Sequence, residues 1–273
     1  LAAFVLIAIS FLNQEFSINS NELSARPYAA SVEDPARCAH VAVVGIILGI
    51  YALLRRNPNI VQKAFIILLI VLGFFILLRL GSRGPVVTLG AVFLFWFISR
   101  QKHLLRIAIP LLVVCVLTIV FQNQILNLIG NISPVMEGRL KLTLFSGDTS
   151  SRDQAYLIAV RAFLEHPIIG KQLEYITPDP LSSMVLHYSE NIIIDAFASL
   201  GVIGGGAMLY FLTAAFRKVY SLIRNNDHHY WVSLLLIQGI AASMFEGAFY
   251  WNLPLSALLT FLFLYSRGHP HKV

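Results

Sequence analysis

Almost every charged residue of this chain lies in a gap between long apolar runs. Hydrophobic residues make up 57% of the sequence and charged residues only 12%, and the mean hydropathy is +0.74. An apolar run of about 20 residues is long enough to cross the hydrocarbon core of a bilayer as a helix. The pattern therefore predicts an all-α fold, a polytopic helical bundle embedded in a membrane.

The apolar runs predict about eight spans within a single membrane domain that covers residues 1–273. The predicted spans are 1–12 in part, 38–54, 64–80, 84–99, 104–121, 190–216, 230–249 and 252–266. The chain begins at Leu1, inside an apolar run and without a basic leader. We therefore expect further spans upstream in a longer protein, and not a signal peptide.

The distribution of Lys and Arg predicts the orientation of these spans. Alternate gaps hold 11 of the 20 basic residues and a single acidic one, Asp227. The basic residues in these gaps are Arg55, Arg56, Lys63, Arg100, Lys102, Arg106, Arg217, Lys218, Arg224, Arg267 and Lys272. Such gaps face the cytoplasm, so the net charge of +6 reflects membrane topology and not nucleic-acid binding.

The remaining gaps form the outer face, and the long loop 122–189 is the one soluble segment large enough to carry a site. Within it, residues 151–166 have the apolar spacing of an amphipathic helix, which Pro167 and Gly170 end. Arg152 stands at its start. We expect this helix to lie along the membrane surface or over a cavity.

Three arginines near the outer boundary allow two interpretations each. Arg79 and Arg83 are four residues apart at the outer end of a predicted span. They either extend to lipid headgroups or form a clamp for a phosphate or pyrophosphate anion. Arg152 is either a solvated loop charge or a further member of that clamp.

The span that begins at residue 190 opens with ionisable residues. Glu190 and Asn191 follow His187 by three and four residues, so on a helix the three residues would share one face. Charged groups entering lipid require a cavity or a partner, although Glu190 could simply stabilise the helix N-terminus and His187 could be interfacial. Gly201 and Gly204 are most simply explained as small residues for close helix packing. No spacing typical of a metal site occurs.

Three short elements resemble those of the O-antigen ligase/polymerase superfamily of bacterial envelope enzymes, in the same order and over nearly the whole chain. The elements are Ser82-Arg83-Gly84, Arg152 with His166-Pro167-Ile168-Ile169-Gly170, and Asn191 with Gly201-x-x-Gly204. In the ligases a catalytic His precedes the Asn, whereas this chain has Glu190, with His187 one helical turn earlier. The Ser-Glu-Asn form resembles the polymerase branch, which joins polysaccharide repeat units.

The resemblance implies an integral-membrane glycosyltransferase of the GT-C type that acts outside the plasma membrane and needs no metal or other cofactor. Its donor would be a glycan linked to undecaprenyl pyrophosphate. A polymerase would transfer the glycan to the terminal sugar of another lipid-linked unit, and a ligase would transfer it to lipid A core or to protein.

The resemblance also implies roles for the candidate residues. Glu190 would act as the base, with His187 as the second candidate. The cations that bind the pyrophosphate would be Arg83, Arg152 and Arg79. Asn191, Gly201 and Gly204 would support the site.

A transporter is the alternative from another class. Transporters usually carry charges near the bilayer midplane, at broken helices in repeated halves of the chain. In this sequence the charges gather at the outer boundary beside a long loop, and no repeat is evident. The sequence therefore favours an enzyme.

Overall fold

The computed structural model describes residues 35–55, 57–100, 117, 120–146, 152–172, 189, 191–225, 230–245 and 253–268. Every element within these ranges is a helix and none is a strand, which confirms the predicted all-α class. The predicted partial span 1–12 and most of the span 104–121 lie outside the described residues. The chain separates into two compact units, Leu1–Gly147 and Asp148–Val273.

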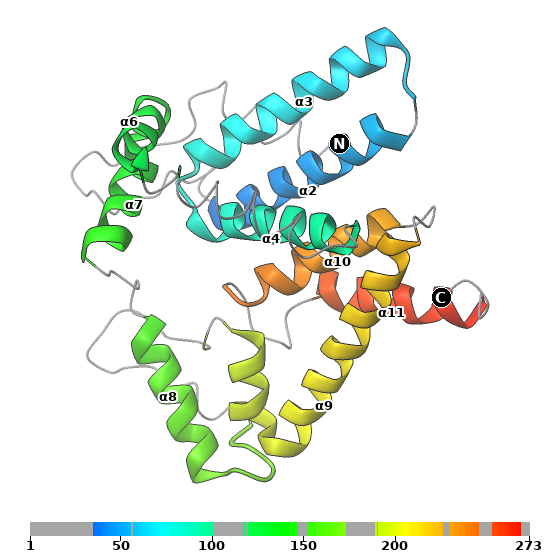
Figure 1. Cartoon of the computed structure of the whole chain (residues 1–273). Coiled ribbons are helices and arrows are strands. Elements are labelled where there is room, and N and C mark those ends of the chain that lie inside the picture. Colours follow the sequence, from blue (N-terminus) through cyan, green and yellow to red (C-terminus); the bar gives the residue numbers. More distant parts are fainter. Residues whose placement is uncertain are drawn as a thin grey trace. The chain divides into compact units, whose positions relative to one another are not determined.

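The first unit is built on a helical hairpin. Helices α2 (Pro35–Arg55) and α3 (Ile60–Arg79) pack against each other, and α2 also packs on α4 (Arg83–Arg100) (Figure 1). Asn59 caps α3 by accepting the Gln62 N–H at 2.9 Å, and the Gln62 side chain accepts the Asn59 N–H in return. The polar connection between the two apolar helices thus ends in a capping box, which fixes where α3 begins.

Helix α3 exposes most of its apolar surface. Its 20 residues span about 30 Å, which equals the thickness of a bilayer's hydrocarbon core. Ile60, Leu68 and Val71 are each more than half exposed. In water such a surface would be unfavourable, whereas lipid tails would cover it. By length and composition α3 and α9 (Ile192–Arg224) are the two helices in the described residues that could cross a membrane.

The first part of the predicted outer loop contains two helices that the sequence reasoning missed. Helices α6 (Gln122–Ile132) and α7 (Pro134–Ser146) pack together. Ser133 joins them, and its hydroxyl accepts the Met136 N–H at 3.3 Å. A serine followed by proline is a known signal for a helix start, so the pair Ser133-Pro134 could have revealed α7.

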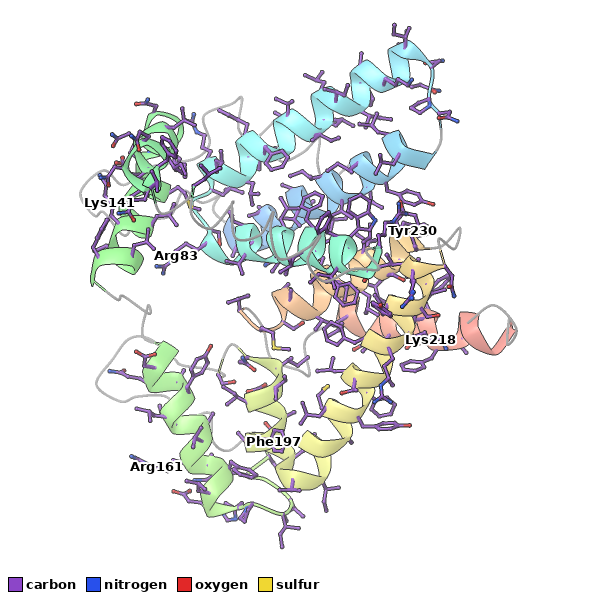
Figure 2. The ribbon with its side chains drawn as sticks, viewed as in Figure 1. Arg83, Lys141, Arg161, Phe197, Lys218 and Tyr230 are labelled. Carbon is purple, nitrogen blue, oxygen red and sulfur yellow. The ribbon has the colours of Figure 1, made fainter. Side chains whose placement is uncertain are left out.

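The second unit contains α8 (Arg152–Glu165), α9, α10 (Tyr230–Ala242) and α11 (Leu253–Gly268). The C-terminal part of α9 buries residues at helical spacing, and α9 packs on α10, which in turn packs on α11 (Figure 2). The buried residues of this part are Leu212, Ala215, Val219, Leu222 and Ile223. The Ile192 N–H donates to the Ser243 carbonyl at 2.9 Å, which ties the start of α9 to the end of α10.

The described helices overlap the predicted spans with two marked differences at an end. Helix α9 continues to Arg224, whereas the sequence predicted a span to residue 216, so Arg217, Lys218 and Arg224 lie on the helix and not in a loop. Helix α10 ends at Ala242, whereas the sequence predicted a span to residue 249. The Met244 and Phe245 N–H groups bond to Ala241 and Ala242, three residues back, and this tightens the chain into a turn. Helix α8 occupies the range in which the sequence predicts a helix.

Candidate functional site

Arg79 and Arg83 lie on either side of the short turn between α3 and α4. Arg79 is the last residue of α3, and its guanidinium lies 6.0 Å from the centre of the Phe75 ring. Arg83 is the first residue of α4 (Figure 2) and is half-buried. Leu80 and Ser82 are buried between them. The turn is therefore anchored by packing, and both arginines belong to this one anchored turn.

Three other candidates, Arg152, His187 and Glu190, lie partly or wholly outside the described residues. Arg152 is the first residue of α8, and only its backbone belongs to the described part of the structure. His187 and Glu190 lie outside it entirely. The roles of these three residues therefore stay predictions. The described part of the site consists of the residues around them.

Asn191 caps α9. Its side-chain oxygen accepts the N–H groups of Ile193 at 3.1 Å and Ile194 at 3.2 Å. The hydroxyl of Ser189 donates to the Asn191 carbonyl at 3.0 Å, and the fully buried Asp195 accepts the Ser189 N–H at 3.5 Å. The two residues that flank Glu190 are thus both held against the first turn of α9.

We expect Asn191→Ala to destabilise the protein by about 1 kcal/mol, the usual effect of losing an N-cap, and to lower the glycan transfer that the family resemblance implies. Asn59→Ala is the matched control, because it removes an equivalent cap from α3. Thermal unfolding in detergent micelles, together with a transfer assay, checks both variants. If the two variants lose transfer equally, the cap at Asn191 has no special relation to the site.

Gly201 interrupts α9, which is a correction to the continuous span predicted for 190–216. Its backbone has φ 64° and ψ −161°, a combination that only glycine adopts readily. The two segments of α9, residues 192–200 and 202–224, meet there at a sharp bend, drawn in yellow-green and yellow in Figure 1. Gly201 therefore serves as a break in the helix and not as a contact point on a continuous one.

Gly204, predicted as a small residue for close helix packing, and the neighbouring Gly205 are closely packed, but the packing is within α9 itself. A Cβ on Gly204 would lie 2.1 Å from the Cβ of Leu200, and one on Gly205 would lie 2.5 Å from the Phe197 ring. Both neighbours belong to the segment before the break. These glycines thus let the two segments of α9 approach each other.

The loop after α8 supplies backbone hydrogen-bond partners at the break in α9. The N–H groups of Lys171 and Gln172 donate to the carbonyls of Ala198 and Ser199, each at 2.9 Å, and the Val202 N–H donates to the Pro167 carbonyl at 2.8 Å. In a continuous helix the Ala198 carbonyl would have accepted the Val202 N–H. A buried backbone group left unpaired costs about 1–3 kcal/mol, so these three bonds stabilise the break.

Helix α8 runs parallel to the first segment of α9. Ala159 and Ala162 pack against Ala198 and Ile194, and the rings of Phe163 and Phe197 meet edge to face at 5.7 Å. The C-terminal ends of both helices meet at the bonded loop, so their N-termini lie at the same end of the pair (Figure 1). Helix α8 is therefore packed on α9 through a face of small residues.

The sequence predicts Pro167 and Gly170 as helix terminators and as part of one family element, but not as residues that contact α9. Besides ending α8, they carry the loop that bonds to the break, and Gly170 has φ +72°. The available signal was the resemblance itself: one element holds the His-Pro-Ile-Ile-Gly run and another holds the Asn-to-Gly run. Because both elements belong to the same family pattern, a contact between them could have been expected although they are far apart in the sequence.

An exposed ion pair also holds the loop. Lys171 Nζ lies 2.8 Å from Glu165 Oε2. The hydrogen bond from Lys171, with the attraction of its charge, holds the pKa of the Glu165 carboxyl below the usual 4.5. Because the pKa is lowered in the folded protein, the ion pair stabilises the fold at pH values above the usual carboxyl pKa. This stabilisation is lost as the pH falls through the lowered pKa.

We expect Glu165→Gln to leave transfer near neutral pH unchanged and to remove a small, salt-sensitive contribution to stability, since exposed pairs contribute little. Thermal unfolding of wild type and variant at neutral and acid pH checks this. The difference between the two proteins should be present at neutral pH and shrink on acidification. A difference that grows in acid would contradict this assignment of the pair.

Among the described residues, no group of three His, Cys, Asp or Glu side chains is placed to hold a metal ion.

Comparison with known proteins gives one match. The model of a protein family described as O-antigen ligase matches residues 67–210, which is more than half of the chain. The matched region includes the turn with Arg83, helix α8, the bonded loop and the break at Gly201. Neither the search of curated proteins nor that of solved structures returned a match. The chain therefore belongs to the O-antigen ligase family, membrane proteins that act as ligase- or polymerase-type enzymes on lipid-linked glycans.

Proposed function

We propose that this protein is a polysaccharide polymerase, an integral-membrane glycosyltransferase of the GT-C type in the bacterial plasma membrane. It moves a glycan from undecaprenyl pyrophosphate to the terminal sugar of another lipid-linked repeat unit. The reaction takes place on the outer side of the membrane, where the predicted topology has the loop 122–189.

The observation that carries this proposal is the parallel packing of α8 on the first segment of α9. Arg152 is the first residue of α8, and Asn191 caps α9 immediately after Glu190. Both helix starts lie at one end of the packed pair, which supports the proposal that Arg152 and Glu190 act at one site. Helix N-termini also carry partial positive charge, which suits an anionic leaving group.

The proposed step is a single displacement. The acceptor hydroxyl oxygen attacks the anomeric carbon of the donor glycan, and the bond from that carbon to the pyrophosphate oxygen breaks. Glu190 accepts the hydroxyl proton, with His187 as the second candidate. The bonding electrons leave with undecaprenyl pyrophosphate, and the configuration at the anomeric carbon inverts.

The arginines stabilise the leaving group. Negative charge grows on the pyrophosphate as the glycosidic bond breaks, so fixed cations bind the transition state more tightly than the ground state. Arg83 and Arg152 have this role in the proposal, and Arg79 supports them. Because the arginines supply the positive charge, the proposal includes no metal ion or other cofactor.

A ligase is the second candidate, because the description of the matching family is O-antigen ligase. A ligase would transfer the finished glycan to lipid A core or to protein. Glu190 in place of a histidine before Asn191 is the feature that favours the polymerase. The two candidates differ in the acceptor, and this difference is visible in cells.

Deletion of the full-length gene in its host, followed by gel analysis of the surface glycan, separates the candidates. For a polymerase, the ladder collapses to single repeat units that are still attached to their acceptor. A ligase predicts that the ladder leaves the acceptor and accumulates on undecaprenyl pyrophosphate. An unchanged ladder would contradict both candidates, provided that the deletion is confirmed.

A further inference from the structure

We propose that Gly170 and Gly201 are positioning residues for the transfer reaction. Their mutual close approach fixes α8 on the first segment of α9 and so sets where Arg152, the first residue of α8, lies relative to Asn191, the cap of α9. This inference rests on the proposed function for the roles of Arg152 and Glu190. It gives the contact between the loop after α8 and the break in α9 a role in the reaction.

Each glycine faces the backbone of the other's segment. A Cβ on Gly170 would lie 2.3 Å from the carbonyl carbon of Ser199, and one on Gly201 would lie 2.3 Å from the carbonyl oxygen of Ile168. The second Cβ would also lie 2.7 Å from the Gly170 nitrogen. Backbone atoms cannot rotate away as a flexible side chain can, so any side chain at either position pushes the loop off the break.

A displacement of the loop passes directly to α8. The His166 N–H donates to the Ala162 carbonyl at 3.2 Å, and the Gly170 N–H donates to the His166 carbonyl at 2.9 Å. The loop is therefore a bonded continuation of α8. Its far side is fixed by the three bonds to Ala198, Ser199 and Val202 described above.

The alanine contacts between α8 and α9, which lie beside Ile194 and the Phe163–Phe197 ring pair, cannot adapt to such a displacement. Ala159 and Ala162 are almost completely buried and have no side-chain freedom with which to adapt. A shift at the junction would therefore move α8 as a rigid element, together with Arg152 at its other end. Displacing a catalytic group by about 1 Å can lower a rate by about 10²-fold.

A purely structural role for the glycines predicts something different. Loss of the junction would then reduce the amount or the thermal stability of folded protein, and the effect on rate would be independent of Arg152. A positioning role predicts that the effect on rate disappears once Arg152 is gone, because residues that act through one another are not additive. The two roles are therefore separable by a double-mutant cycle.

The experiment uses purified full-length protein in detergent micelles with a synthetic undecaprenyl-pyrophosphate-linked repeat unit. The variants are Gly201→Ala, Gly170→Ala, Arg152→Ala and the Gly201→Ala/Arg152→Ala double variant. Gly206→Ala is the matched control, because a Cβ at Gly206 meets no atom within 4 Å. The kcat and KM of each variant are measured per folded molecule.

We expect Gly201→Ala and Gly170→Ala each to lower kcat by about 10²-fold with little change in the donor KM. In the Arg152→Ala background, Gly201→Ala should lower kcat little further, and Gly206→Ala should match wild type. Multiplicative effects of Gly201→Ala and Arg152→Ala would overturn the inference. An Arg152→Ala variant with full activity would instead remove Arg152 from the proposed function.

A second route keeps the test decisive if the glycine variants do not fold. Ala162→Val enlarges the buried face of α8 and pushes it from α9 without replacing either glycine. The same loss of kcat, again absent in the Arg152→Ala background, is expected. Folded Ala162→Val protein with a wild-type kcat would contradict the claim that the placement of α8 controls the reaction.

Discussion

Replacing Glu190 with Gln is expected to lower the rate of glycan transfer by about 10²- to 10⁴-fold, the range of a positioned general base. Glutamine keeps the size and polarity of the side chain but cannot accept the proton of the acceptor hydroxyl. Since Asn191 and Asp195 hold the chain on either side of position 190 through hydrogen bonds that do not involve Glu190 itself, the fold should tolerate the change. The measurement is the transfer rate with a lipid-linked repeat unit as both donor and acceptor.

Glu165→Gln is the matched control for this variant, because it makes the same chemical change at an exposed position on α8. It should retain transfer while Glu190→Gln loses it. His187→Ala tests the second candidate for the base in the same assay. Full activity of Glu190→Gln combined with inactive His187→Ala would move the role of the base to His187.

Replacing Arg83 with Ala is expected to lower the transfer rate by about 10²- to 10³-fold, as losing one fixed group that stabilises transition-state charge does. Arg83→Lys should recover only part of this loss. Lysine keeps the charge but loses the two-pronged hydrogen bonding that a guanidinium offers to phosphate oxygens. Transfer rates at saturating donor separate this effect from weaker donor binding.

Arg100→Ala provides the control within the same helix. Arg83 and Arg100 are the first and last residues of α4, and the Arg100 guanidinium lies 5.0 Å from the Trp96 ring centre. The predicted topology puts Arg100 on the cytoplasmic side, so its loss should spare transfer. If Arg83→Ala and Arg83→Lys are both fully active, Arg83 only anchors the helix at the lipid headgroups.

The sequence was sufficient to predict the long helices because their signals are local. Long apolar runs predicted α3 and α4, and apolar residues at helical spacing followed by Pro167 and Gly170 predicted α8. The break at Gly201 escaped prediction because it depends on a loop some 30 residues earlier in the chain, which supplies partners for the carbonyls of Ala198 and Ser199. A glycine in an apolar run carries no local sign of such a partner.

The candidate site was predictable to a similar extent. The match to residues 67–210 confirms the family and includes all three family elements. The elements did not reveal how they connect, since Gly170 and Gly201 make contact through backbone atoms that any sequence contains. Asn191 was predicted as a supporting residue, and its physical contribution, the cap on α9, is a hydrogen-bond geometry that only coordinates show.

The most direct test of the polymerase proposal is reconstitution of the full-length protein in liposomes with an undecaprenyl-pyrophosphate-linked repeat unit as the only glycan. No lipid A core or acceptor protein is present. We predict products of two or more repeat units, still linked to undecaprenyl pyrophosphate, together with released undecaprenyl pyrophosphate. If no product forms until lipid A core is added, and the glycan then appears on that core, the protein is a ligase and the polymerase proposal is wrong.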